Sequence, residues 1–163
     1  MRWPSTVWFA VNITGELTTG DYTNDIAKSD IKNVVIGTNV TSIGDYAFQA
    51  CNALESITIP DTVTNISTFS FYQCSSLEPI IIPDSVTSIY KSSNSSYLPF
   101  NGCNLIEVYI SASTAEKLDL KFGNNQPFYG NNMNDSLQIL LLACHAAWIY
   151  CGLNALLTPF STP

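Results

Sequence analysis

The chain has 163 residues, of which 46% are apolar and 12% charged, a composition that fits one folded domain rather than a disordered segment. Six Lys and Arg stand against thirteen Asp and Glu, so the net charge is −7. Nucleic-acid binding needs a basic surface, and this balance therefore argues against a nucleic-acid partner. It also argues against electrostatic attraction to an anionic membrane.

The first predicted element is a short strand near the N-terminus. After Arg2, residues Val7 to Val11 form an apolar run. A secretory signal peptide needs about 7–15 apolar residues and a small-residue cleavage site, and this run is shorter. We therefore predict no clear signal peptide, and an edge strand within an N-terminal capping region that covers residues 1–30.

From residue 31 onward a motif of 23 residues recurs, starting at Ile31, Leu54 and Leu77, with a further partial copy from Leu105. A fixed period of this size predicts a solenoid, in which each repeat buries its apolar face against the next. In each copy the apolar residues at the fourth and sixth positions, such as Val34 and Ile36, lie two residues apart, as in a strand with one buried face. The predicted buried columns are Ile31, Leu54, Leu77 and Leu105; Val34, Ile57, Ile80 and Val108; and Ile36, Ile59, Ile82 and Ile110.

Each strand is followed by a turn and a second inward row. Pro60 and Pro83 end two of the strands, with Gly37 in the same position of the first copy. The second row consists of Val40, Val63 and Val86 with Ile43, Ile66 and Ile89, and a wide position further on is filled by Phe48, Phe71 and Phe100. The segment from Gly44 to Cys51 is long enough for one or two helical turns.

Three of the five cysteines fall at equivalent positions, Cys51, Cys74 and Cys103. We predict a buried column in which they pack as small hydrophobic side chains, in preference to disulfides or a metal site. Cys144 and Cys151 are seven residues apart (144 to 151). On a helix their Cα atoms would be ~10 Å apart, too far for a disulfide.

The strings Leu54–Ile66 and Leu77–Ile89 both read Leu-x-x-Ile-x-Ile-Pro-Asp-x-Val-Thr-x-Ile or a close variant of it. This pattern resembles the BspA-like (Treponema pallidum type) leucine-rich repeat, and Ser42–Cys51 is similar to its other half. The resemblance implies an α/β, strand-dominated, short right-handed solenoid over residues 31–136, with short helical or turn segments on its back. It also implies a non-enzymatic cell-surface protein that binds or adheres to a partner.

The third copy contains an insertion. Eleven steps separate Ile89 from Phe100, where the earlier copies use five, and the extra residues within Tyr90–Leu98 are polar. Insertions in solenoids form surface loops, some of which bind partners and many of which are merely tolerated.

Beyond Ile110, the segment from Ser111 to Leu118 predicts a helix that starts with a Ser or Thr cap. The segment from Phe128 to Asn131 is weakly similar to that from Phe48 to Cys51, which suggests a degraded fourth repeat. The apolar tail of residues 137–163 has two open interpretations. Residues 137–157 have the length of a membrane-spanning helix, whereas Leu137 to Leu142 matches the strand template Leu-x-x-Ile-x-Ile. The absence of flanking Lys or Arg beyond Lys121 favours the strand slightly.

Catalysis is unsupported by the sequence. The one histidine, His145, lies in the apolar tail, where the sequence offers no residue to orient it. Asp61 and Asp84 occupy equivalent turn positions, so turn geometry explains them better than acid–base catalysis does. We predict no catalytic residue, no metal site and no cofactor. The main hypothesis is an interaction module with a protein or glycan partner. The alternatives are a small ectodomain anchored in a membrane by residues 137–157 and, from another class, a small hydrolase.

Binding should use the strand residues that point away from the core. Stacking would align alternate positions of successive strands into an outward row on the concave face of the sheet. The candidate binding residues are Val35, Thr58, Ile81 and Tyr109, flanked by Ser56 and Glu107.

Overall fold

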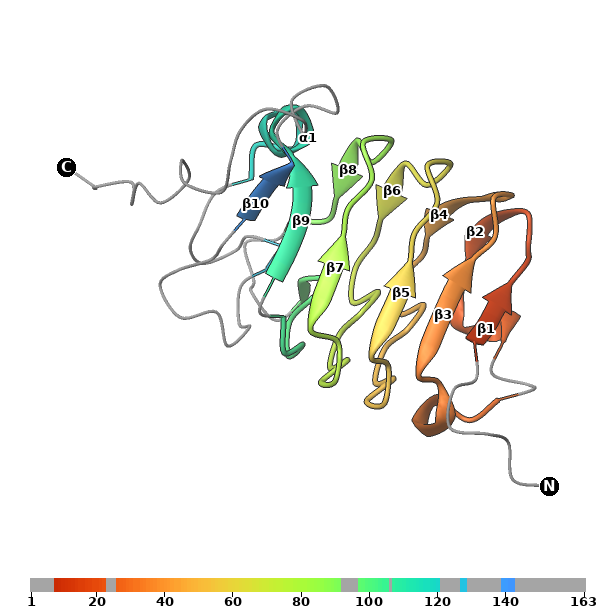
Figure 1. Cartoon of the computed structure of the whole chain (residues 1–163). Coiled ribbons are helices and arrows are strands. Elements are labelled where there is room, and N and C mark those ends of the chain that lie inside the picture. The colour runs from red at the N-terminus through yellow and green to blue at the C-terminus, as the bar shows by residue number, and fades with distance from the viewer. Residues whose placement is uncertain are drawn as a thin grey trace.

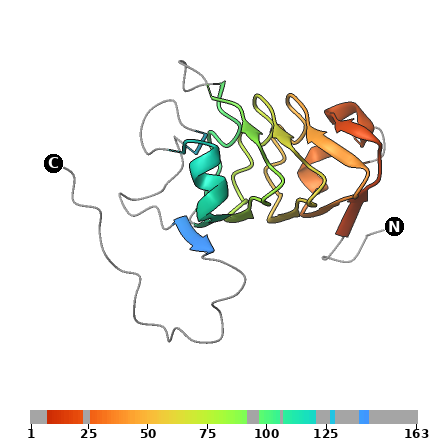
Figure 2. The same cartoon turned by 90° about the horizontal axis from the view of Figure 1, so that it is seen from above.

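The computed structural model describes residues 8–22, 26–91, 97–105, 107–120, 127–128 and 139–142, and for residues 8, 9, 107 and 139–142 it describes the backbone alone. In this part of the chain the backbone winds into successive coils stacked side by side (Figures 1 and 2). Two sides of each coil are strands that pair in parallel with the neighbouring coils, and the third side is a series of turns. The strand-dominated solenoid predicted from the repeat is confirmed.

Within the described residues, the front side, which faces the viewer in Figure 1, contains six strands, and the second side contains four. The front strands are β1 (Trp8–Val11), β3 (Asn33–Ile36), β5 (Ser56–Thr58), β7 (Pro79–Ile81), β9 (Glu107–Ser111) and β10 (Ile139–Leu142). The second sheet consists of β2 (Gly15–Leu17), β4 (Val40–Ile43), β6 (Asn65–Ile66) and β8 (Ser88–Ile89). The helical elements in the described part of the chain include the 3-10 turns η1 (Thr19–Asp21) and η2 (Lys28–Asp30) and the α-helix α1 (Ala112–Lys117).

The apolar columns predicted from the repeat form the core. In the front sheet Val34 pairs with Ile57, and Ile80 with Val108, and all four side chains are buried. The strand-opening residues Ile31, Leu54, Leu77 and Leu105 are buried as well, as are the inward valines and isoleucines of the second sheet. Stacking therefore creates one continuous hydrophobic interior, because no single coil could enclose these side chains alone.

Aromatic rings form a second column along the whole stack. Phe71 stacks between Phe48 and Phe100, with ring centroids 5.4 and 5.1 Å away. Phe128 continues the column at 4.9 Å from Phe100, which places it in the position of the Phe of a further repeat, as the sequence suggested. Tyr22 begins the column at 5.3 Å from Phe48. Stacked rings at such spacings add to the stability that burial alone supplies.

The cysteines Cys51, Cys74 and Cys103 are buried and free, which confirms the predicted column. The thiol of Cys74 donates a hydrogen bond to the carbonyl of Phe48 at 3.1 Å, and the thiol of Cys103 donates to the carbonyl of Phe71 at 3.0 Å. Each thiol thus satisfies a backbone acceptor of the preceding coil. Cys144 and Cys151 lie outside the described residues.

The third side is a ladder of turns, and the helix considered for Gly44 to Cys51 is not formed. The N–H groups of Tyr46, Phe48 and Ala50 donate to carbonyls of the next coil, while those between them donate to carbonyls three residues earlier in their own coil. Tyr46 and Ala50 have left-handed backbone, with φ of 60° and 59°. A left-handed residue interrupts a right-handed helix, and each such turn gains hydrogen bonds to its neighbour that a helix would forgo.

The front sheet is hydrogen-bonded in two parts. β5 and β7 lie side by side in Figure 1, yet pairing runs β1-β3-β5 and, separately, β7-β9-β10. The residue that begins β5, Ser56, donates its N–H to the carbonyl of Lys32 in the preceding coil. Its counterpart in β7 is Pro79, which has no N–H to donate. Proline at this position accounts for the interruption.

Residues 8–22 form a coil of their own. β1 is the predicted edge strand and pairs with β3, while β2 pairs with β4. Gly37 shows how closely the two coils approach, since a Cβ on it would lie 2.9 Å from the carbonyl oxygen of Val11. Its N–H also donates to that oxygen at 2.8 Å, so neither alanine nor the proline of the later copies would fit here.

At the other end, α1 starts as predicted. Ser111 is its N-cap and accepts a hydrogen bond from the N–H of Thr114 at 3.2 Å. The strand predicted for residues 137–142 also forms, as β10, but one residue out of the expected register. The template aligned Leu140 with Val108, whereas Ile139 is the residue that pairs with it. Leu141 likewise pairs with Ile110, where the template aligned Leu142.

The described residues include no helix that is both long and apolar enough to span a membrane. Of the segment 137–157, for which a membrane helix was considered, the structure describes only the strand β10. His145 lies outside the described residues.

Candidate interaction surface

The strand register aligns the predicted outward positions in two pairs. Val35 pairs with Thr58 across β3 and β5, and Ile81 pairs with Tyr109 across β7 and β9. β5 and β7 lie side by side in Figure 1, and Thr58 and Ile81 follow the equivalent buried residues Ile57 and Ile80. Thr58 and Ile81 are exposed, and Val35 and Tyr109 are half-buried. Ala10 of β1, which the sequence interpretation left out, pairs with Val35 and extends the row by one exposed position.

Ile81 is the most exposed large hydrophobic side chain among the described residues, with 59% of its surface accessible. It stands in the part of the front sheet where hydrogen bonding between β5 and β7 is interrupted. The row is thus apolar at its centre, with a branched aliphatic side chain held away from the core by the alternation of the strand.

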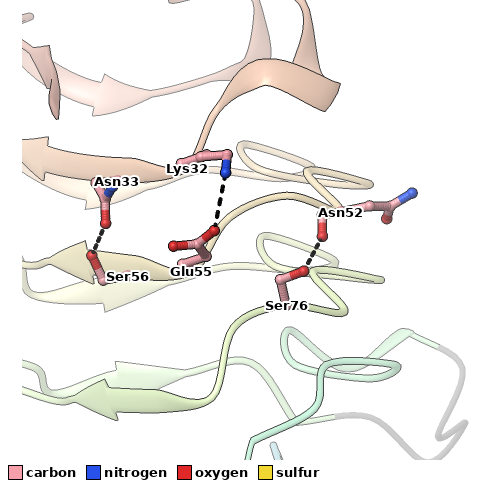
Figure 3. Close-up of polar contacts among 6 residues, drawn as sticks. All are labelled: Lys32, Asn33, Asn52, Glu55, Ser56 and Ser76. Carbon is pink, nitrogen blue, oxygen red and sulfur yellow. Dashed lines mark hydrogen bonds and ion pairs between the residues drawn. The ribbon is translucent and has the colours of Figure 1, made fainter. Parts of the chain in front are cut away.

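Polar side chains lie at the start of β3 and β5, since Asn33 and Ser56 stand two residues before Val35 and Thr58. Figure 3 shows the contacts among them. Ser56 donates a hydrogen bond to the Oδ1 of Asn33 at 2.6 Å, and the ammonium of Lys32 lies 3.4 Å from the carboxylate of Glu55. Both members of this ion pair are well exposed, so its contribution to stability is small. For the remaining candidate, Glu107, the structure gives the backbone position only, opposite Pro79 in the register.

A second surface, which the sequence interpretation missed, lies on the turn side. Tyr46 and Phe69 stack with their ring centroids 5.2 Å apart, and Phe69 also contacts Tyr72 edge-on at 4.9 Å and Tyr97 at 5.3 Å. We call these four residues the aromatic patch. Tyr46 and Phe69 are 23 residues apart (46 to 69), so the repeat phase could have revealed them, but both fall outside the strands.

The thiols of Cys51 and Cys74 are buried and hold their protons. Burial raises the pKa of the Cys51 thiol, and the neighbouring Cys103 thiol together with burial raises the pKa of Cys74 well above its ordinary value. Burial also raises the pKa of the Tyr22 hydroxyl, which donates to the carbonyl of Ala47. A thiol acts as a nucleophile in its ionised form, so the raised pKa values oppose a nucleophilic role for Cys51 and Cys74. In the part of the chain that is described, no three His, Cys, Asp or Glu side chains gather as metal ligands would.

Comparison with known proteins identifies the repeat. Residues 23–98 match the model of the BspA type Leucine rich repeat region, in six copies. No curated protein matches the chain by sequence. Among solved structures, the chain is similar to a leucine-rich repeat protein from Eubacterium ventriosum ATCC 27560, with 18% identity over 66% of this chain and a TM-score of 0.34. This chain spans 40% of that protein, well under two thirds of its length.

Repeats of this kind stack into solenoids whose surfaces serve as platforms for interaction with other proteins. Together with the register of the front sheet and the columns of the core, the match establishes what this part of the molecule is: residues 23–98 of this chain are a BspA-type leucine-rich repeat region.

Proposed function

We propose that this chain is a non-enzymatic interaction module displayed at a cell surface, and that it binds a partner protein through the outward row of the front sheet. The observation that carries the proposal is the exposure of Ile81, at 59%, in the centre of an aligned row. Single exposed apolar residues are ordinary on protein surfaces. An exposed isoleucine aligned with Thr58, Val35 and Tyr109 across neighbouring strands offers a surface that a partner can cover.

The surroundings of the row resemble the rim of an interface. Ser56, Asn33, Lys32 and Glu55 supply hydrogen-bonding and charged groups beside an apolar centre. Protein interfaces combine an apolar core with a polar, solvent-accessible rim in this way. Glu107, next to Pro79 in the register, would extend the rim toward β9.

A protein partner fits this row better than a glycan does, because its centre is aliphatic. Sugars bind chiefly through hydrogen bonds and stacking on aromatic faces, and Tyr109 is the one aromatic residue among the six candidates. Adhesion through a glycan is the alternative form of the proposal. The membrane-anchored alternative required a helix over residues 137–157, and β10 occupies four of these residues as a strand paired with β9.

The test uses Ile81→Ser in the full chain. Immobilised wild-type protein is used to capture surface proteins, and the captured protein is then titrated in purified form. Loss of a central apolar contact should weaken its affinity by about 5- to 30-fold. Because Ile81 is mostly exposed, the thermal midpoint should hardly change.

Tyr90→Ser is the matched control, since it also removes an exposed large side chain but one that belongs to neither the front row nor the aromatic patch. The control should bind the captured protein as the wild type does. Equal affinity of wild type and Ile81→Ser would exclude the front row as the contact surface. A glycan array probed with the same three proteins distinguishes the alternative: a sugar bound by the wild type and lost in Ile81→Ser would indicate glycan adhesion instead.

A further inference from the structure

The aromatic patch is built from two coils and the end of the insertion. Tyr46 belongs to one coil, Phe69 and Tyr72 to the next, and Tyr97 follows the inserted residues and returns to contact Phe69. Tyr46 is 43% exposed and Tyr97 is 45% exposed. The patch is separate from the buried column of Phe48, Phe71 and Phe100, so the solenoid core is complete without it.

The backbone presents two of these rings at an energetic cost. Tyr46 and Phe69 have φ of 60° and 53°, and bulky residues are rarely found in the left-handed region. Both sit at the same position of successive turns and stack on each other across the coils. The left-handed backbone conformation of Tyr46 and Phe69 costs free energy and is nevertheless retained. This suggests that the two rings themselves have a role.

Charged side chains of both signs lie on the turn side. The ammonium of Lys28 donates to the carbonyl of Gln49 at 2.7 Å, so this cation is already bound to the backbone, whereas two carboxylates stand close to the exposed rings. Asp45 directly precedes Tyr46, and its Oδ1 accepts a hydrogen bond from the N–H of Thr68, the residue before Phe69. The hydroxyl of Thr19 donates to the carbonyl of Tyr46 at 2.6 Å and so places η1, with Asp21, beside the patch.

We propose that the aromatic patch binds a basic peptide segment of a partner protein, with Arg or Lys side chains over the exposed faces of Tyr46 and Tyr97 and next to Asp45. Cations are attracted to the faces of aromatic rings, and guanidinium groups stack on them. The adjacent carboxylates add charge complementarity, which a neutral sugar would not use. A second copy of this chain is disfavoured as the occupant because each copy carries a net charge of −7.

The test measures binding of a fluorescein-labelled peptide of alternating Arg and Ser to the full chain by fluorescence anisotropy. The wild type should bind it saturably, and the affinity should fall as NaCl is raised. The double variant Tyr46→Ser, Tyr97→Ser should bind roughly ten-fold more weakly, since two ring contacts are removed. Asp45→Asn keeps the acceptor for the Thr68 N–H and should reduce the salt dependence.

Ile81→Ser is the control that separates this inference from the front-row proposal, and it should bind the peptide as the wild type does. Circular dichroism verifies that each variant is folded. If the double serine variant does not fold, Tyr46→Leu, Tyr97→Leu keeps apolar packing while removing the rings, and the same loss of affinity is expected.

Three results would overturn the inference. Unchanged affinity in the double variant would mean that net charge alone attracts the peptide. Equal binding of a peptide of alternating Glu and Ser would exclude recognition of cations. Absence of saturable binding by the wild type, or a wild-type dimer in sedimentation that the ring variants lose, would exclude a basic segment as the occupant.

Discussion

At the scale of single residues, the turn side depends on a backbone conformation that most side chains avoid. Ala50, Gln73 and Gly102 take equivalent positions in three successive coils, with φ of 59°, 59° and 75°. The third coil already uses glycine, which adopts this conformation without a steric cost. The first two coils retain side chains there, so each stores local strain that a glycine would release.

We therefore expect Ala50→Gly to raise the free energy of unfolding. Relief of left-handed strain, about 1–2 kcal/mol, should exceed the entropic cost of glycine in the unfolded chain, about 0.5–1 kcal/mol. Urea unfolding of the full chain measures the difference. The matched control is Ala53→Gly, where φ is not positive and the same change should cost stability. Equal losses in both variants would show that Ala50 carries no strain.

At the scale of elements, the repeat predicted strands better than it predicted turns. The strands β3, β5, β7 and β9 form with the expected residues inward, because a period of two leaves a clear record in the sequence. The segment from Gly44 to Cys51 could have formed a short helix, because over a single turn a helix and a tight turn place their apolar residues at the same spacing. Hydrogen bonds to the next coil decided between them, and a sequence does not display those.

The register of β10 was wrong for a similar reason. Leu137 to Leu142 is apolar at nearly every position, so alternation does not mark its inward face. The coil of residues 8–22 was expected only as an edge strand. Its copy is spaced at 25 residues (Trp8 to Asn33) and has Tyr22 in place of a Phe, so it falls outside the 23-residue phase.

The start of α1 also ties one coil to the next. Ser111 accepts the Thr114 N–H and donates to the carboxylate of Asp84, and the hydroxyl of Thr114 donates to the same carboxylate at 2.8 Å. Ser111→Ala should therefore lower the free energy of unfolding by about 1–2 kcal/mol, as for loss of a helix cap. Chemical denaturation provides the measurement.

Glu116→Ala is the control for this cap, because Glu116 is exposed inside α1 and alanine is the better helix former. It should leave the stability unchanged or raise it slightly. A loss at position 116 as large as that at 111 would mean that the cap does not explain the effect.

At the scale of the whole molecule, the sequence indicated the front surface but not the turn surface. Val35, Thr58, Ile81 and Tyr109 could be aligned from the repeat alone because strand register follows the period. The aromatic patch depends on left-handed turns and on where the insertion returns, and neither follows from a hydrophobic pattern. Surfaces that arise from loops are therefore found only once the coils are placed against one another.

The thiol column gives the whole stack a pH dependence. Burial raises the pKa of Cys51, and the neighbouring Cys103 thiol together with burial raises that of Cys74, so both thiols hold their protons more tightly in the folded chain than in the unfolded one. In the unfolded chain these thiols have a pKa of about 8.5. Above that pH the unfolded state has lost protons that the folded state keeps, so stability falls with rising pH, by up to about 1.4 kcal/mol per pH unit for each thiol.

Urea unfolding under reducing conditions at about pH 7.5 and about pH 9.5 tests this, with Cys51→Ala, Cys74→Ala as the comparison. The double variant should be less stable at the lower pH, because two buried sulfur atoms are removed. Its loss of stability between the two pH values should nevertheless be smaller than that of the wild type. Parallel pH curves for the two proteins would show that the thiols ionise equally in the folded and unfolded states, and that the column is not sealed from water.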